Sequence, residues 1–490
     1  MSADARNLLF ISSDQHARRV AGCYGDGIVA TPNLDRIAAE GVAFDAAYCP
    51  SPICTPSRMA MLTARRPHRQ SCWTNDDALD PAIPTWPHAL GAAGKRPALI
   101  GRLHALGPDQ LHGYAERQVG EHSPNWPGVA RHDLGPLAGA NDPDPRALSA
   151  SGAGFCAYQA KDEAVTQAAV AWLRDVAPER AAADGFALTV GYMLPHPPYV
   201  AEPEAFARYA GRVPPPRLAP PAQEHPFHAW WRRDRGIAEV EPDAAARARA
   251  AYWALVDRLD AMIGRLLAAL EQTGLLDDTL VVYASDHGDH LGERGLWWKH
   301  SFFEESVAVP LLMRLPGVLP AGERRGRVVD LCDLAMTMLE ALGAPAPPGA
   351  DGRSFWRVAR DGGAPWIDEA FSEYCTDAVP DWTGGRAVRQ RMIRSGRWKL
   401  VFYDGEPPQL FDLEADPDEA EDLAGAPAAA AIRETLLRRV LDGWNPDDIR
   451  RRMEARRREK DLIGRWARAV RPPDAHLWSV DPAVNRLHRP

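Results

Sequence analysis

Polar side chains that bind metals and anions follow four apolar segments of the sequence. They are Asp14 and Gln15 after residues 7–13, Arg102 and His104 after residues 97–101, His196 after residues 186–194, and Asp286 and His287 after residues 279–285. Carboxylate oxygens, amide oxygens and imidazole nitrogens are common ligands of divalent cations. Asp14, Asp286 and His287 are therefore candidate metal ligands, with Gln15 as a possible carbonyl donor. A helix cap or a turn is the alternative for each aspartate taken alone.

A cysteine stands just before a predicted helix. The residues Ser51-Pro-Ile-Cys-Thr-Pro-Ser-Arg58 run directly into an apolar helical stretch. Pro56 suits the first helical position and Thr55 the N-cap, so we expect Cys54 immediately ahead of the helix N-terminus. The free N–H groups there favour an anion, and Arg58 adds a guanidinium suited to sulfate or phosphate oxygens. A small buried cysteine without a chemical role is the alternative.

The four apolar segments are predicted to be parallel strands of one sheet. Helical patterns lie between them, among them residues 31–41, 162–176 and 244–274. Strands that alternate with helices indicate an α/β fold, a large, mostly parallel sheet with helices on both faces. In such sheets the carboxyl ends of the strands share one edge, where ligands bind. We therefore expect the polar residues named above to meet at that edge.

The sequence changes character after about residue 370. Residues 371–374, 387–395, 398–403 and 409–413 read as short strands joined by turns, which predicts an antiparallel meander. We predict three parts: a catalytic α/β domain (1–370), a smaller subdomain with the antiparallel sheet (371–430), and a helical, basic tail (431–490). The proline-rich residues 203–226 are predicted to be an irregular surface segment.

Composition excludes several classes of protein. The 57 Lys and Arg residues against 66 Asp and Glu give a net charge of −9, so nucleic acid is not an expected partner. No apolar run approaches the length of a membrane span, and the N-terminus does not resemble a signal peptide. The seven cysteines are sparse and odd in number. We expect a cytoplasmic protein without disulfides or membrane contact.

The tail departs from the overall acidity. Residues 449–471 are strongly basic and have a partly helical apolar period. A helix that packs one face on the body of the protein or on a sister subunit explains this pattern. We predict that the tail wraps a neighbouring subunit in a homo-oligomer, a dimer or a tetramer.

The string Cys54-Thr-Pro-Ser-Arg58 resembles the C-x-P-S-R motif of type I sulfatases, members of the alkaline phosphatase superfamily whose motif cysteine is converted to formylglycine. Further motifs of that family follow in the family's order: Gly101-Arg-Leu-His104, Pro195-His-Pro-Pro-Tyr199, Ser285-Asp-His-Gly-Asp289 and Trp298-Lys-His300. The pairs Asp14-Gln15 and Asp286-His287 resemble the pattern found in the branch of choline sulfatases and phosphonate monoester hydrolases. Arg102 stands where the family usually has lysine, and because arginine stays protonated it can hold an anion but not donate a proton.

The resemblance implies a mechanism. Hydrated formylglycine at position 54 would attack sulfur beside a divalent metal. The resemblance favours Ca²⁺, with Mn²⁺ or Mg²⁺ as alternatives. The cation would be held by Asp14, Gln15, residue 54, Asp286 and His287. Arg58, Arg102 and Lys299 would clamp the sulfuryl oxygens, His196 with Lys299 would protonate the leaving alcohol, and His104 would act as base in the second step. A formylglycine-generating enzyme would be needed for maturation.

Three functions remain open on the sequence. The first is a hydrolase of a small sulfate monoester, either choline sulfate or an aryl or alkyl sulfate. The second is a phosphonate monoester or phosphodiester hydrolase that uses the same site. The third is an anion-binding protein without catalysis, which requires an unmodified Cys54. Asn75 stands where the choline sulfatase group has an active-site asparagine, and Trp126 and Glu373 are candidate parts of a quaternary-ammonium site, with ordinary packing as the alternative.

Overall fold

A large sheet forms the centre of the protein. The computed structural model describes residues 4–129, 134–221 and 223–488. The sheet has eight strands in the order β10-β2-β9-β8-β1-β6-β3-β4, and β9 runs antiparallel to both of its neighbours. The strands are β1 (Asn7–Asp14), β2 (Val42–Tyr48), β3 (Ala98–Gly101), β4 (Glu116–Gln118), β6 (Ala187–Pro195), β8 (Thr279–Ser285), β9 (Leu311–Arg314) and β10 (Glu323–Asp330). The predicted α/β class with a mostly parallel sheet is confirmed.

The four strands predicted from the sequence are direct neighbours. They lie in the order β8-β1-β6-β3, and each adjacent pair is parallel. In register, Leu8 of β1 pairs with Ala187 of β6 and Leu280 of β8, and Ser13 pairs with Ser285. The carboxyl ends of these strands therefore open on one edge of the sheet, as expected for an α/β fold.

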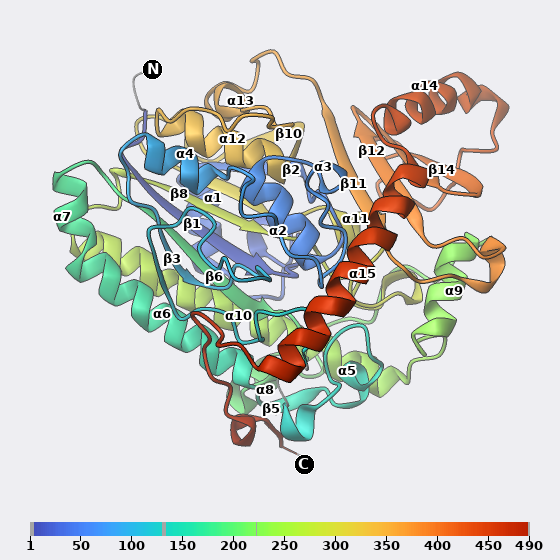
Figure 1. Ribbon diagram of the computed structural model, residues 1–490, viewed down its shortest axis with the longest axis horizontal. Coiled ribbons are helices and arrows are strands. Elements are labelled where there is room, and N and C mark those ends of the chain that lie inside the picture. Colours follow the sequence, from blue (N-terminus) through green and yellow to red (C-terminus); the bar gives the residue numbers. More distant parts are fainter. Residues whose placement is uncertain (1–3, 130–133, 222, 489–490) are drawn as a thin grey trace.

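Helices cover both faces of the central sheet (Figure 1). On one face lie α2 (Cys54–Thr63), α4 (Trp86–Ala92) and α12 (Leu331–Ala341), and on the other α6 (Ala157–Asp175) and α10 (Pro242–Gln272). The other helices before the second sheet are α1 (Pro32–Ala39), α3 (Pro67–Gln70), α5 (Arg146–Ser149), α7 (Ala177–Ala182), α8 (Pro203–Tyr209), α9 (Pro226–Asp234), α11 (Glu304–Val307) and α13 (Trp356–Arg360). The presence of α8 corrects the prediction that residues 203–226 are irregular throughout, because Pro203 occupies a first-turn position, where proline is tolerated.

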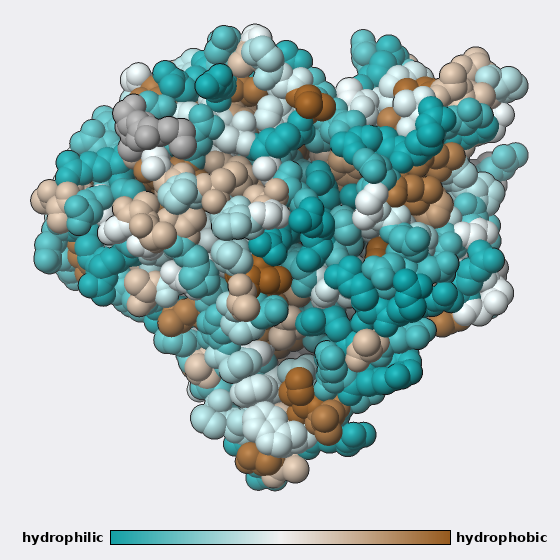
Figure 2. Space-filling model, turned by 45° about the horizontal axis from the view of Figure 1, so that its top comes forward, coloured by the Kyte–Doolittle hydropathy of each residue, from teal (hydrophilic) through white to brown (hydrophobic). Residues whose placement is uncertain are grey.

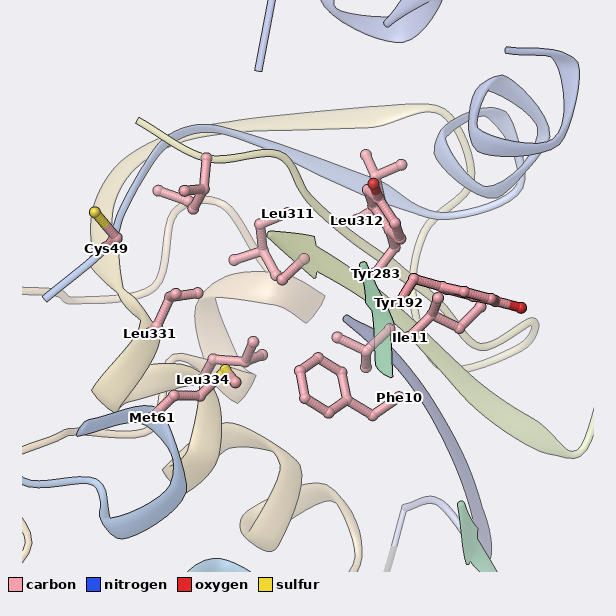
Figure 3. Close-up of a cluster of buried hydrophobic side chains, with 14 of the residues drawn as sticks. Phe10, Ile11, Cys49, Met61, Tyr192, Tyr283, Leu311, Leu312, Leu331 and Leu334 are labelled. Atoms are coloured by element: carbon pink, nitrogen blue, oxygen red, sulfur yellow. The ribbon is translucent and has the colours of Figure 1, made fainter. Parts of the chain in front are cut away.

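Burial on both faces explains the composition of the central strands. Every residue of β1 is buried, including its last polar residues. Figure 3 shows Phe10 and Ile11 of β1 with Leu331 and Leu334 of α12 in one apolar cluster. Such continuous apolar runs are typical of parallel strands with helices on each face. The core thus fixes the strand whose end carries Asp14.

A second, antiparallel sheet follows the central sheet in the sequence. Its strands β11 (Glu369–Cys375), β12 (Arg389–Ser395), β13 (Trp398–Tyr403) and β14 (Glu406–Asp412) pair in sequence order. The predicted meander is therefore confirmed. Helix α14 (Ala430–Leu441) packs on this sheet through Leu436 and Val440, which lie in one apolar cluster with Leu400 of β13.

The basic segment of the tail forms a single long helix that packs on the body of its own chain. Helix α15 (Pro446–Val470) crosses the molecule in Figure 1. It buries Ile449 and Met453 but leaves Trp466 and Val470 exposed, and Figure 2 shows hydrophobic residues in small separate areas of a mainly hydrophilic face. The end of the chain returns to the body, where β15 (Arg486–Leu487) extends the small sheet of β5 (Gly152–Phe155) and β7 (Val200–Ala201). Wrapping of a neighbouring subunit stays a prediction.

The described helices give no candidate for a membrane span. Among residues 4–129, 134–221 and 223–488, none is long and apolar enough to cross a bilayer.

Candidate active site

Cys54 is the first residue of α2, at the edge where the four parallel strands end. Ile53, in extended backbone, is the N-cap, and no side chain caps the helix. The prediction that Thr55 caps α2, with Cys54 ahead of the helix, is wrong by two residues. The Thr55 hydroxyl donates to the carbonyl of His104 instead. The Thr55 N–H donates to Asn75 Oδ1 at 2.9 Å. The helix start thus ties Cys54 to the segments of Asn75 and His104.

Four predicted metal-binding residues meet at this point. Oxygen, nitrogen or sulfur atoms of Asp14, Cys54, Asp286 and His287 all lie within 4.8 Å of one another, and all four residues are buried. His287 Nε2 is 3.2 Å from Cys54 Sγ and 3.6 Å from Asp286 Oδ1. This donor set fits Ca²⁺, Mg²⁺ or Mn²⁺, which accept carboxylate and imidazole ligands.

Gln15 lies beside this group, with its side chain turned to two other residues. Its Oε1 accepts a hydrogen bond from Lys299 Nζ at 2.7 Å, and its Nε2 donates to Asp289 Oδ2 at 2.8 Å. Its backbone N–H donates to Asp286 Oδ1 at 3.0 Å. Its predicted role as a metal ligand stays a prediction.

Two buried arginines neutralise the aspartates. Arg58 Nε donates to Asp286 Oδ2 at 2.7 Å, and Arg102 Nε donates to Asp14 Oδ2 at 2.6 Å. Arg58 also reaches Asp14 Oδ2 at 3.2 Å. Buried carboxylates need such partners, because removing one partner of a buried ion pair destabilises a protein by roughly 3–5 kcal/mol. Both arginines therefore hold the aspartates. Arg102 also lines the cavity described below, whereas Arg58 is not among the described residues that line it.

Lys299 and His196 lie on the cavity side of Cys54. Lys299 Nζ is 3.2 Å from Cys54 Sγ and 2.7 Å from Asp142 Oδ2, and His196 Nε2 is 3.3 Å from Asp142 Oδ1. Burial lowers the pKa of His196, but Asp142 outweighs this and raises that pKa to about 10. Asp142 was not predicted as a site residue, because it lies in an irregular segment without a motif or a periodic pattern.

The Cys54 thiol is strongly acidified by its surroundings. Burial raises the pKa of Cys54, but the positive charges of Lys299 and His287 outweigh burial, so the pKa lies well below the usual range of a thiol. The surroundings of atom Sγ thus favour a negatively charged atom at position 54. This is the property that a nucleophile at this place requires.

His104 is held in a left-handed backbone conformation with a φ of 60°. Arg102 Nη2 lies 2.8 Å from His104 Nδ1. Because a guanidinium only donates, Nδ1 accepts this bond, and the neutral ring carries its proton on Nε2. Burial and the charge of Arg102 lower the pKa of His104. In this arrangement His104 offers an N–H, so its predicted role as a base requires that the bond to Arg102 breaks.

A small cavity of about 160 Å³ opens on these groups. Its lining includes Cys54, Asn75, Arg102, His104, Asp142, His196, Lys299 and His300. Nη1 of Arg102 is buried without a hydrogen-bond partner among the described residues. Since buried N–H donors are nearly always paired, this one indicates a place for an anionic oxygen. His300 was not predicted to have a role in the site, and its φ of 82° is unusual for a residue with a side chain.

Trp126 and Glu373 are not among the described residues that line this cavity. Trp126 stacks edge to face on Trp466 of α15, with ring centroids 5.0 Å apart. Glu373 accepts from the backbone N–H and from Nδ1 of His68, at 3.1 Å and 2.7 Å. Ordinary packing, the alternative weighed for both residues, accounts for these contacts.

Family comparisons agree with this geometry. A model of the sulfatase family matches residues 6–344, and one of the C-terminal region of N-sulphoglucosamine sulphohydrolase matches residues 292–444. The chain belongs to the sulfatase family. It is accordingly a sulfuric ester hydrolase, and its resemblance to type I sulfatases is confirmed.

Relatives of this sulfatase include enzymes with different substrates. A choline-sulfatase of Rhizobium meliloti (strain 1021) is 32% identical over 468 residues, covering 89% of this chain and 86% of the relative. Arylsulfatase K of Bos taurus is 30% identical and covers 90% of this chain and 82% of the relative. Among solved structures, the phosphonate monoester hydrolase of Silicibacter pomeroyi is similar with a TM-score of 0.72 and 27% identity, over 89% of this chain and 94% of that one.

Proposed function

We propose that this sulfatase hydrolyses a small sulfate monoester, choline sulfate or an aryl or alkyl sulfate, to the alcohol and inorganic sulfate. The observation that carries the proposal is the unpartnered Nη1 of Arg102 in a cavity that also contains Cys54 and Lys299. A sulfuryl group would accept from these donors, while position 54 faces its sulfur. Electrostatic stabilisation of this kind is usually the largest catalytic contribution.

A divalent cation fits the residues at the centre of the site. Asp14, Asp286 and His287 would hold it, with position 54 as a further ligand, because their donor atoms already converge. When bound, the cation would polarise a sulfuryl oxygen and lower the pKa of a coordinated hydroxyl. The paired arginines fit this arrangement, since Arg58 holds Asp286 and Arg102 holds Asp14 through one carboxylate oxygen each.

Formylglycine at position 54 fits the same surroundings. The C-x-P-S-R string is present at residues 54–58, and Cys54 begins a buried helix beside the candidate ligands. The hydrated aldehyde would supply two hydroxyl groups where the thiol supplies one sulfur atom. Asn75 orients the helix start by accepting the Thr55 N–H, which keeps position 54 directed into the cavity.

The remaining residues act on the ester from the cavity side. Lys299 donates toward position 54 and would bind a sulfuryl oxygen. His196, together with Lys299 on the shared Asp142, would protonate the alcohol as it leaves. Cleavage breaks the S–O bond to the alcohol, whose oxygen keeps the electron pair and takes the proton.

A phosphonate monoester or phosphodiester hydrolase is the second candidate. The fold similarity to the phosphonate monoester hydrolase of Silicibacter pomeroyi favours it, because a tetrahedral phosphonate would fit the same cationic groups. The two functions are separated by the relative kcat/KM on an aryl sulfate and a matched aryl phosphonate monoester.

The test uses protein co-expressed with a formylglycine-generating enzyme. Intact mass spectrometry should show a loss of about 18 Da from Cys54, the difference between a thiol and an aldehyde at that carbon. The modified protein should release sulfate from choline sulfate or 4-nitrophenyl sulfate, and C54A should not. Full activity of protein with an intact thiol would contradict the proposal, and so would a clear preference for phosphonate.

A further inference from the structure

One carboxylate contacts both groups that are proposed to protonate the leaving alcohol. Asp142 Oδ2 lies 2.7 Å from Lys299 Nζ, and Asp142 Oδ1 lies 3.3 Å from His196 Nε2. The Asp142 side chain is only 7% exposed and lines the cavity beside both partners. Each oxygen of one carboxylate therefore faces a different cation.

The segment that carries Asp142 is anchored to the same strand as His196. Leu134, Leu137 and Ala140 are buried in an apolar cluster with Met193 of β6. His196 follows the end of β6, and its backbone N–H donates to the carbonyl of Met193 at 3.0 Å. Packing on one strand end thus fixes Asp142 relative to His196, so the position of the carboxylate does not depend on a flexible surface loop.

Lys299 needs such an anchor because it has several other acceptors within reach. Its Nζ also lies 2.7 Å from Gln15 Oε1 and 3.2 Å from Cys54 Sγ. Without Asp142 the ammonium group would turn toward the negative charges around Cys54 and Asp14. Asp142 pulls it to the cavity side, where it lies next to His196.

His196 is constrained in a similar way. Its Nδ1 lies 2.6 Å from the carbonyl of Pro197, which can only accept, so Nδ1 donates and Nε2 is the nitrogen that faces the cavity and Asp142. The ring is thereby oriented from both sides. The nitrogen directed at Asp142 is the one available to a leaving oxygen.

We propose that Asp142 is a positioning residue for protonation of the leaving group, which holds Lys299 Nζ and His196 Nε2 side by side at the oxygen of the departing alcohol. The inference rests on the proposed function. As sulfur bonds to the nucleophile at position 54, the S–O bond to the alcohol breaks, and the alcohol oxygen keeps the electron pair and takes one proton from this pair of donors.

The proposal predicts a loss that depends on the leaving group. A good leaving group such as 4-nitrophenolate departs without a proton, whereas an alkoxide requires one. For D142N we expect kcat/KM to fall by about 100-fold on an alkyl sulfate but by no more than about fivefold on 4-nitrophenyl sulfate, since general acid catalysis is worth about 10²–10⁴-fold. In a series of aryl sulfates, kcat/KM of D142N should fall more steeply with increasing pKa of the phenol than kcat/KM of the wild type.

D144N is the matched control. Asp144 lies in the same segment and accepts only from the backbone N–H of Arg146 among the hydrogen bonds of the described residues, at 2.8 Å, outside the cavity lining. D144N removes the same charge as D142N and should leave kcat/KM unchanged for every ester of the series. D142E keeps the charge but displaces it, so an intermediate loss with the same dependence on leaving group is expected, and this variant replaces D142N if the latter does not fold.

The outcomes separate the two proposals. An equal loss on all esters, or no loss on any, overturns the role of Asp142, because a merely structural residue would not discriminate between leaving groups. A wild-type protein that carries modified Cys54 and a bound metal, yet hydrolyses no sulfate ester, overturns the proposed function instead. Melting curves of all variants, recorded under the same conditions, show which of them are folded.

Discussion

The carboxylate of Glu121 accepts the backbone N–H of His104 at 2.6 Å, and the same oxygen accepts the N–H of Leu103 at 2.8 Å. It also pairs with the buried Arg117 at 2.5 Å. Glu121 therefore fixes the turn after β3 in which His104 adopts its left-handed conformation. This turn places Arg102 and His104 in the cavity.

We predict that E121A remains folded but loses most of its activity. Loss of the acceptor frees the turn, and displacement of a catalytic group by about 1 Å can cost about 100-fold in rate. E121Q keeps an oxygen at the same place and should retain most of the activity of the wild type. Steady-state kinetics of both variants test this, with melting temperatures as a check of folding. Equal losses in E121A and E121Q would show that charge, not the shape of the turn, is what matters.

Gly191 allows β3 and β6 to approach closely before Arg102. The Arg102 N–H donates to the carbonyl of Gly191 at 2.8 Å, and a Cβ atom on Gly191 would lie 2.0 Å from the carbonyl oxygen of Arg102. We predict that G191A destabilises the protein by about 1–3 kcal/mol, the usual cost of overpacking, and lowers kcat by displacing Arg102. Urea unfolding and kinetics measure the two effects.

G326A is the control for this change. Gly326 also lies in a strand of the central sheet, β10, and a Cβ atom there meets no atom within 4 Å. Stability and activity of G326A should stay close to those of the wild type. A G191A protein as stable and active as G326A would refute the close approach.

The strand ends were predictable because local signals and a general rule agree there. Continuous apolar runs identified β1, β3, β6 and β8, and the ends of parallel strands share an edge. Each run ends in residues that have no reason to follow an apolar core unless they are functional or form a turn. The sequence alone therefore predicts that Asp14, Arg102, His196 and Asp286 meet at one edge of the sheet.

Asp142 and Glu121 could not be predicted in the same way. Both lie in segments without regular period, and both act through neighbours that are distant in sequence, such as Lys299 for Asp142. Only tertiary packing brings these pairs together. The helix cap was missed for a related reason, since the Thr55 hydroxyl is recruited by His104, a residue of another loop.

Removal of a divalent cation from the proposed site should lower stability as well as activity. A chelator leaves the carboxylates of Asp14 and Asp286 close together, balanced only by their protein partners. We predict that chelation abolishes ester hydrolysis and lowers the melting temperature, because a ligand at 100 times its Kd stabilises the folded state by about 2.7 kcal/mol. Addition of Ca²⁺, Mn²⁺ or Mg²⁺ in separate experiments identifies the cation that restores both properties.

D14N provides the matched variant for the metal. It keeps the shape of the side chain but removes one ligand charge, so a higher metal concentration should be needed for the same rise in melting temperature. D277N, at an exposed aspartate, should behave as the wild type. A melting temperature of the wild type that does not respond to any cation would contradict a metal site at these residues.

Glu373, in strand β11 of the antiparallel sheet, contributes to stability through charge pairing. Burial raises the pKa of its carboxyl, but His68 and Arg391 outweigh burial and lower that pKa to about 2. A pKa below the unfolded value means that the stabilisation is present above about pH 4.5 and is lost as the pH falls toward 2. The size of the shift corresponds to about 3 kcal/mol.

We predict that E373Q is less stable than the wild type at pH 7 and that the difference shrinks as the pH falls below 4.5, where Glu373 of the wild type takes up a proton. Urea unfolding between pH 7 and the acid limit of folding measures this, with E414Q, at an exposed glutamate, as the control. Because both carboxylate oxygens already accept from His68, KM for choline sulfate should stay near its wild-type value in folded E373Q. A KM that rises for choline sulfate but not for 4-nitrophenyl sulfate would instead assign Glu373 to a quaternary-ammonium site, and would show that its contact with His68 opens when the substrate binds.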